Sequence, residues 1–423
     1  MKMTSKTFLR SAAIFVVILM AFVISRKWVL ANPPTEYSDV KQDYERYANM
    51  WRYGLTPYRE HLYEYPPATI PVVYLPLELD QRGVGKYYPN YRDEIFIIEF
   101  CMFVFVVCCL WGYPVSRFSK VASLLFYLIA GMIAKDFWYE GIDLVFFGSI
   151  TCLLAWVYAS DQSIFKNRLL TWILFWFSVA VKLITFPLAV PIFLMSKSKK
   201  LSSELMASFL GGLIVWVVPL LAYRSSLSVF LVFHASRPLK FGAFGSYIIE
   251  LINDFTKTEH RVQIGPDYPM SGPVSDIVTK IDSILFPVAI ALFLLWSGKQ
   301  ILQCKSLLQK KMNYLIMHNA LVLSYVFMFF LTTKTFSSPF HIWYIPLLAI
   351  YPFTTQRSRI AVFLGALLML GLDTTPYLKA PAGYLFNTIP FYHLRDALRF
   401  IPMILMFGYF ASRVKIRQKP KKA

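Results

Sequence analysis

The sequence lacks the short motifs that mark several large enzyme classes. No segment matches GxxxxGK[ST], HExxH, CxxC or GxSxG. These absences argue against an ATP-driven pump, a zinc protease and a serine hydrolase of the usual kinds. Any chemistry must therefore come from ionisable side chains that are scattered along the chain.

Cysteine is also scarce. The predicted outer loops contain none of the five cysteines, which lie in predicted helices or on the predicted cytoplasmic side: Cys101, Cys108, Cys109, Cys152 and Cys304. No disulfide framework is implied. We interpret these thiols as small apolar side chains.

Apolar residues, by contrast, make up 57% of the 423 residues, which is more than one soluble core of this size can bury. Long apolar runs approach the roughly 20 residues that cross about 30 Å of hydrocarbon. They are apolar on all sides, which favours helices over the alternating strands of a barrel. The sequence predicts an all-α polytopic membrane protein with about ten spanning helices, near 9–28, 94–112, 119–135, 141–159, 203–223, 281–299, 312–332, 340–354, 359–373 and 396–412.

Three segments depart from this pattern. Leu169 to Met195 lies between basic loops, so two short helices that meet near Lys182 fit the charge pattern better than one span. The stretch 66–79 is apolar but too short to cross, which indicates an interfacial or re-entrant segment. The stretch 38–53 predicts an amphipathic surface helix with Ser38 as its N-cap.

The net charge of +19 comes from basic residues in short loops. If the N-terminus is cytoplasmic, these loops fall on one side together with only two acids, Asp161 and Glu204, which is the positive-inside pattern. We therefore expect a plasma-membrane protein with both termini in the cytoplasm and no nucleic-acid partner. The first helix is expected to stay as an anchor. Cleavage after Val29-Leu30-Ala31, as in a signal peptide, is the alternative.

No internal repeat or separate soluble domain is evident, so residues 1–423 are predicted to form one membrane domain. Its two large outer loops are expected at 31–92, which carries the candidate active site, and at 224–280. Turn-forming residues are prominent in the second loop.

Two carboxylates in the first outer loop are candidates for chemistry. Partial desolvation of Asp39 would raise its proton affinity toward that of a useful general base, although a capping aspartate is the simpler interpretation. Glu64 has the same ambiguity, because a glutamate before Pro-Pro can simply hold a rigid turn.

The candidate cations lie in or beside apolar segments. Lys182 interrupts an apolar run, where an ammonium needs a partner or a cavity, unless it extends to the interface. Arg237 and Lys240 in the second outer loop could bind a lipid phosphate, or only lipid headgroups in general. His341, at the outer edge of a late helix, could donate to an anionic leaving group or be structural.

The motifs SDVKQDY (38–44), GLTPY (54–58) and EYPP (64–67), followed by VKLITFPLAVP (181–191) and SSPFHIWYIP (337–346), occur in this order along the chain. In this order they resemble the polyprenol-phosphate-dependent glycosyltransferases of the GT-C fold, most closely glycosyltransferase family 87. Only the block 38–67 is specific, and the loop around Arg237 matches loosely.

The resemblance implies an inverting glycosyltransferase that moves a hexose or pentose, with mannose favoured, from a polyprenyl-phosphate donor. The acceptor would be a hydroxyl of a glycolipid or glycan on the extracytoplasmic side. Asp39 would be the base, and the substrate-binding residues would be Glu64, Tyr65, Lys182, Arg237, Lys240 and His341. No cofactor is expected, although Asp39 and Asp43 could share a cation. A transporter or flippase of a lipid-linked sugar is the competing hypothesis.

Overall fold

The computed structural model describes residues 5–34, 38–111, 113, 115–196, 200–237, 239–240, 242–256, 260–261, 270–304, 308, 310–374 and 389–415. In these residues the protein is helical, apart from one antiparallel pair of two-residue strands, β1 (His260–Arg261) and β2 (Met270–Ser271). The all-helical prediction is confirmed at this level.

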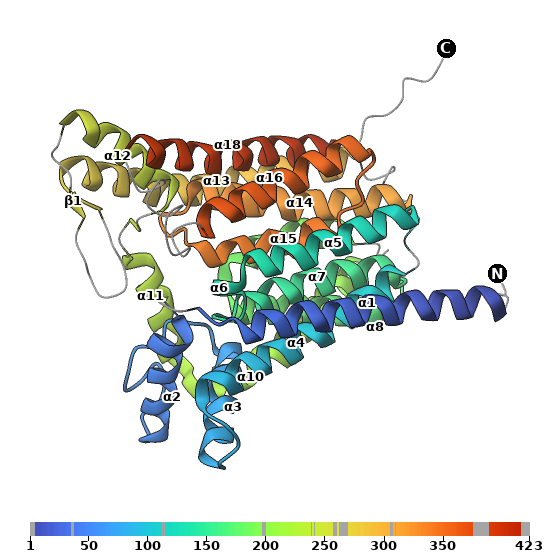
Figure 1. Ribbon diagram of the computed structural model, residues 1–423, viewed down its shortest axis with the longest axis horizontal. Helices are drawn as coiled ribbons and strands as arrows, with labels where there is room; N and C mark the ends of the chain where they lie inside the picture. Colours follow the sequence, from blue (N-terminus) through green and yellow to red (C-terminus); the bar gives the residue numbers. More distant parts are fainter. Residues whose placement is uncertain are drawn as a thin grey trace.

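The long helices lie side by side and form a bundle, as Figure 1 shows. They are α1 (Ser5–Ala31), α4 (Tyr87–Leu110), α5 (Arg117–Ile133), α7 (Asp143–Ala159), α8 (Phe165–Val181), α10 (Leu201–Tyr223), α13 (Pro273–Cys304), α14 (Lys311–Thr332), α15 (His341–Ile350), α16 (Gln356–Thr374) and α18 (Ile389–Val414). Each apolar run of the sequence that was expected to cross overlaps one of these helices, although the run 340–354 extends beyond the end of α15.

Five helices among the described residues are long and apolar enough to span a bilayer: Ala13–Ala31, Leu201–Tyr223, Pro273–Cys304, Met312–Thr332 and Leu394–Val414. Four further apolar helices are shorter, at 118–133, 143–159, 183–194 and 338–350. Membrane helices are therefore compatible with the structure, and the number of about ten crossings stays a prediction.

Burial separates central helices from peripheral ones. Nearly every side chain of α7 and α15 is buried. The peripheral helices α10 and α13 instead expose large apolar side chains, with Leu221 and Leu295 each 72% exposed. Apolar surface this extensive is rare on soluble monomers and fits contact with lipid.

One buried ion pair and two hydrogen bonds from a buried arginine tie α1 to the rest of the bundle. Arg26 Nε lies 2.9 Å from Glu99 Oε1, and both side chains are almost fully buried. Tyr127 and Tyr139 donate their hydroxyls to the same carboxylate, at 2.6 and 2.5 Å. Arg92 donates to the last carbonyls of α1 at Val29 and Leu30, where a cation also complements the helix dipole.

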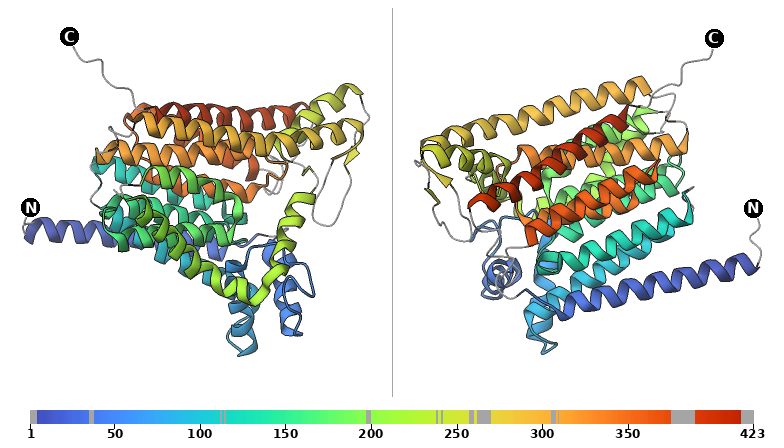
Figure 2. Two further views of the ribbon diagram at one scale, coloured as in Figure 1. Left: turned by 180° about the vertical axis from the view of Figure 1, so that it is seen from behind. Right: turned by 45° about the horizontal axis from the view of Figure 1, so that its top comes forward.

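At one end of the bundle, smaller elements extend beyond it. In Figures 1 and 2, α2 (Glu45–Arg52) and α3 (Ile70–Gln81) project from the bundle, preceded by the π-helix η1 (Val40–Tyr44) and the 3-10 turn η2 (Pro67–Thr69). The predicted surface helix in 38–53 is thus η1 and α2 in sequence. Ser38 Oγ accepts the N–H of Lys41 at 3.3 Å, as a capping serine does.

The second outer loop is more helical than its turn-forming residues indicated. It contains the 3-10 turn η4 (Arg224–Leu227), α11 (Ser228–Ser236), α12 (Phe244–Thr256) and the first turns of α13. Part of the glycine- and proline-rich stretch, residues 264–269, lies outside the described residues.

The predicted break in 169–195 is present. Helix α8 ends at Val181, Lys182 is extended, and the chain continues as the 3-10 helix η3 (Leu183–Leu188) and α9 (Ala189–Leu194). Pro187 lies within η3, where its missing N–H does not interrupt a longer helix. The first part is a 17-residue helix rather than a short one.

Candidate functional site

Asp39 lies directly after the segment that follows α1, at the start of η1, and is half-buried. The preceding residue, Ser38, is buried and donates a short hydrogen bond from Oγ to Glu140 Oε2. Tyr88 donates to the other oxygen of Glu140 at 3.0 Å. Contacts to α4 and to the turn before α7 therefore fix the backbone that carries Asp39.

Glu140 is a site residue that the sequence analysis missed. Burial raises the pKa of its carboxyl, and the hydrogen bond from Ser38 and the charge of Arg92 oppose this rise. Arg92 Nε lies 3.0 Å from Glu140 Oε1. The signal in the sequence is weak, since a lone acid between two apolar helices resembles an ordinary loop residue.

Tyr44 connects the surroundings of Asp39 with the interior of the bundle. Its ring packs edge-on against Tyr65, with 5.4 Å between the ring centroids. Burial first, and then neighbouring groups that include Asp39 and Asp143, raise the pKa of Tyr44 well above its ordinary value. Burial and the charges of Glu64 and Asp39 raise the pKa of Tyr65 in the same way. Both phenols therefore stay protonated and can donate hydrogen bonds.

Lys182 has the partner that its position in an apolar run requires. Its Nζ lies 2.5 Å from Asp143 Oδ1, and Trp343 Nε1 donates to the same oxygen at 2.5 Å. The ammonium also lies 4.8 Å from the centroid of the Trp343 ring. The break after α8 places Lys182 at this point because the extended residue is no longer constrained by the helix.

Glu64 of the EYPP turn contacts the second outer segment. Its carboxylate lies 4.0 Å from Arg237 Nη1 and accepts from the Tyr47 hydroxyl at 3.4 Å. Its backbone oxygen lies 2.9 Å from His234 Nε2. A carbonyl only accepts, so Nε2 of His234 carries the proton.

His234 was not expected from the sequence. Crowding by surrounding atoms, followed by the positive charge of Arg237, lowers the pKa of His234 to about 4, although the residue as a whole is exposed. The charge of Lys182 contributes to the same shift. His234 is therefore neutral at pH 7. A histidine on a short loop helix gave no pattern that could have identified it.

These contacts bring together five of the predicted residues, namely Asp39, Glu64, Tyr65, Lys182 and Arg237. We call them, with Tyr44, Asp143 and His234, the outer-end cluster. It combines a half-buried carboxylate, neutral phenols and two cations, which is a set suited to deprotonating an alcohol and binding an anion.

The structure places the other two predicted residues differently. Lys240 is partly buried, and its backbone N–H donates to the Lys334 carbonyl at 2.8 Å. His341 is fully buried, with Nδ1 2.7 Å from the Tyr344 hydroxyl and Nε2 2.6 Å from Asp373 Oδ2. Trp343, two residues later on α15, contacts Asp143 instead. A role of Lys240 or His341 in substrate binding stays a prediction.

Asp43, the suggested partner of Asp39 for a shared cation, pairs with Arg46 at 2.9 Å. Among the described residues, no group of three His, Cys, Asp or Glu side chains is arranged to hold a metal ion.

Comparisons of the chain with protein-family models, with curated proteins and with solved structures found no match.

Proposed function

We propose that the protein is an integral-membrane inverting glycosyltransferase that uses a polyprenyl-phosphate sugar as donor. The observation that carries the proposal is the outer-end cluster. In it, Tyr44 and Asp143 connect the SDV segment and the EYPP turn with the Lys182 segment. The sequence motifs that carry the resemblance are far apart in the chain. A shared site requires them to lie close together in the folded protein.

In this proposal, Asp39 accepts the proton of the acceptor hydroxyl as its oxygen attacks the anomeric carbon. The new bond joins that oxygen to the anomeric carbon, and the bond from this carbon to the phosphate oxygen breaks. The electron pair leaves with the polyprenyl phosphate, and attack from the opposite face inverts the configuration. Positioning and general-base catalysis would contribute most of the rate enhancement, because a lipid phosphate is already a good leaving group.

The cations of the cluster have distinct proposed roles. Arg237, whose Nη1 lies 4.0 Å from Glu64 Oε2, would bind the phosphate in a bidentate manner. Lys182 is held by Asp143 and would stabilise the departing negative charge. Neutral Tyr65, which is partly exposed, would donate a hydrogen bond to a sugar hydroxyl.

We place the outer-end cluster on the extracytoplasmic face of the plasma membrane. The charge asymmetry of the loops supports this orientation. About ten crossings, cytoplasmic termini, and a glycolipid or glycan acceptor complete the proposal.

The test supplies membranes that contain the protein with radiolabelled polyprenyl-phosphate sugars and measures label in glycolipid and glycan products. We expect transfer from one donor sugar. Arg237→Gln should raise the KM for the donor roughly tenfold, as expected for the loss of one charge-assisted interaction. Arg52→Gln, an exposed arginine at the end of α2, is the matched control and should leave KM unchanged.

The broken helix beside a buried Lys182–Asp143 pair also favours a second function, a transporter of a lipid-linked sugar. The same membranes distinguish the two functions. Movement of intact labelled donor across the bilayer, without any label in products from the whole donor panel, would reject the transferase and support the transporter.

A further inference from the structure

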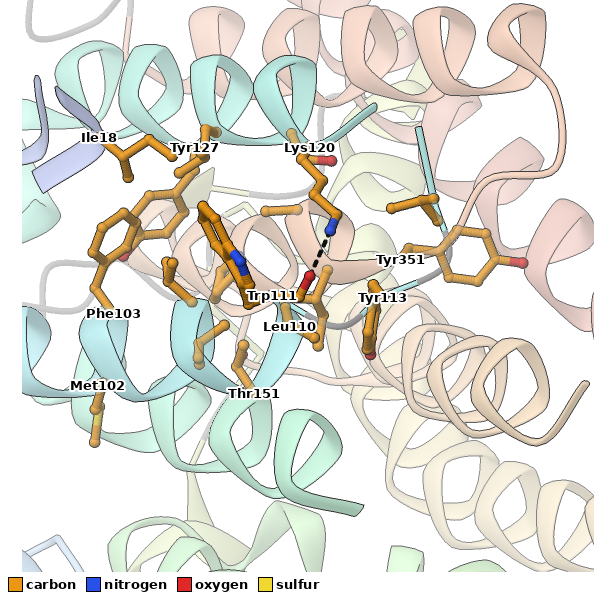
Figure 3. Close-up of a pocket in the computed structure, with 18 of the residues that line it drawn as sticks. Ile18, Met102, Phe103, Leu110, Trp111, Tyr113, Lys120, Tyr127, Thr151 and Tyr351 are labelled. Atoms are coloured by element: carbon orange, nitrogen blue, oxygen red, sulfur yellow. Dashed lines mark hydrogen bonds between the residues drawn. The ribbon is translucent and has the colours of Figure 1, made fainter. Parts of the chain in front are cut away.

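An apolar cavity separate from the outer-end cluster lies between α1, α4, α5, α7 and α15 (Figure 3). Its cavity volume is about 140 Å³, and it is partly open to the surroundings. Its lining is mostly apolar, with rings of Phe103, Trp111 and Tyr127 among the side chains. A lining of this kind favours an apolar ligand.

The cavity runs along α4 from Glu99 to Trp111, which is about 18 Å at a rise of about 1.5 Å per residue. One leaflet of a bilayer has a hydrocarbon layer of about 15 Å, half of the full core. The cavity is therefore about as long as the depth that one acyl chain occupies in a leaflet.

Arg359, at the start of α16, lines this cavity and is only 4% exposed. Its Nη1 donates to Gln356 Oε1 at 2.8 Å, and its Nε has no hydrogen-bond partner. Among the residues that the structure describes, no carboxylate lies within ion-pairing distance of this guanidinium. A buried cation is costly unless an anion compensates it, so the unpaired Nε indicates a place for an anionic ligand.

A second cationic side chain lies at the same end of the cavity as Arg359. Lys120, one turn into α5, lines the cavity, and its Nζ donates to the Trp111 carbonyl at 2.7 Å. This end of the bundle is the one where α1 begins and α18 ends, as Figure 1 shows. It lies opposite α2, α3 and the outer-end cluster.

We propose that this cavity binds an anionic phospholipid of the adjacent leaflet. One acyl chain occupies the apolar cavity, and the phosphate accepts hydrogen bonds from Arg359, with Lys120 adding positive charge. The length of the cavity, its apolar lining and the buried guanidinium at one end together match this class of ligand. The proposal does not depend on glycosyl transfer.

The test uses the purified full-length protein and native mass spectrometry with phosphatidylglycerol or phosphatidylcholine in detergent micelles. We expect phosphatidylglycerol to bind more tightly than phosphatidylcholine. Arg359→Gln should weaken phosphatidylglycerol binding about tenfold or more. Arg357→Gln is the matched control, because Arg357 is exposed on the same helix two residues earlier and the charge change is identical.

A second variant keeps the test decisive if Arg359→Gln does not fold. Ser123→Trp fills the cavity from α5 without altering either cation, and it should also abolish preferential binding of phosphatidylglycerol. In the wild type, phosphatidylglycerol with a photoreactive acyl chain should label residues of the lining such as Val106 and Leu124.

Equal losses in Arg359→Gln and Arg357→Gln would show general attraction to surface charge and would overturn the proposal. Displacement of phosphatidylglycerol by a polyisoprenyl phosphate, with no effect of Arg359→Gln, would also overturn it by assigning the cavity to the donor lipid.

Discussion

His234 is the residue for which the structure predicts a pH response most clearly. Its pKa is lowered to about 4, chiefly by crowding from surrounding atoms, from an ordinary value of 6.5. Between these two values the unfolded chain binds more protons at this residue than the folded protein. The contribution of His234 to stability is therefore present above about pH 6.5 and is lost as the pH falls toward 4.

We accordingly expect the apparent Tm of the wild type to fall more steeply between pH 6.5 and pH 4 than that of His234→Gln. Thermal unfolding of both proteins in the same detergent across this range checks the prediction. Parallel curves would show that His234 does not titrate in this way.

At the residue scale, the sequence identified ionisable groups but not their partners. Lys182 was recognisable because an ammonium interrupts an apolar run. Its partner Asp143 was not, because an acid at the start of an apolar helix resembles a capping residue. Glu140 and His234 were missed for the same reason: their importance depends on contacts with Ser38 and Glu64 that only the folded chain creates.

At the scale of elements, the close packing of α8 and α10 explains why position 211 is a glycine. At Gly211 of α10, an added Cβ would lie 2.9 Å from the backbone carbon of Trp172 on α8. This contact involves backbone, which cannot move aside as a flexible side chain can. Gly211 therefore allows α10 and α8 to approach.

Gly211→Ala should destabilise the protein by about 1–3 kcal/mol, the range for overpacking a close contact. Gly408→Ala on α18 is the control, since no atom lies within 4 Å of its added Cβ, and it should be neutral or slightly stabilising because alanine favours helix. Thermal unfolding of the two variants compares them. A loss in both, or in neither, would contradict the close approach of α8 and α10.

Helix positions were largely predictable at this scale, because apolar runs and their charged flanks define them. The break at Lys182 was also predictable, from the basic loops on both sides and from Pro187. The helices of the second outer segment were not. Helix α12 packs against α13, α14 and α18, so tertiary contacts stabilise a helix that lies between two stretches rich in turn-forming residues, 236–246 and 264–273.

The whole molecule has two different ends, and its orientation in the membrane can be tested directly. Tyr53, which follows α2 and is 82% exposed, lies at the end of the molecule that carries the outer-end cluster. Lys166 is exposed near the start of α8. We expect a membrane-impermeant maleimide to label Tyr53→Cys in intact cells and Lys166→Cys only after permeabilisation, in a background without the native cysteines. The reverse pattern would put the outer-end cluster in the cytoplasm.

The proposed orientation rests on composition alone, through the charge asymmetry of the loops. Composition does not predict that the site residues meet. Residues 39, 64, 182 and 237 are brought together by the packing of helices, and a single sequence does not specify which helices pack together. The apolar cavity beside Arg359 could not be predicted either, since its lining comes from six helices.

The central claim is that Asp39 acts as a base on a bound acceptor, and one comparison of kcat with donor affinity tests it most directly. With the labelled donor that the wild type uses, Asp39→Asn should bind donor as tightly as the wild type but transfer at least about 100-fold more slowly, as expected for the loss of a general base. Asp43→Asn, the same change four residues later in η1, should keep near-normal kcat. Full transfer activity in folded Asp39→Asn would contradict the account.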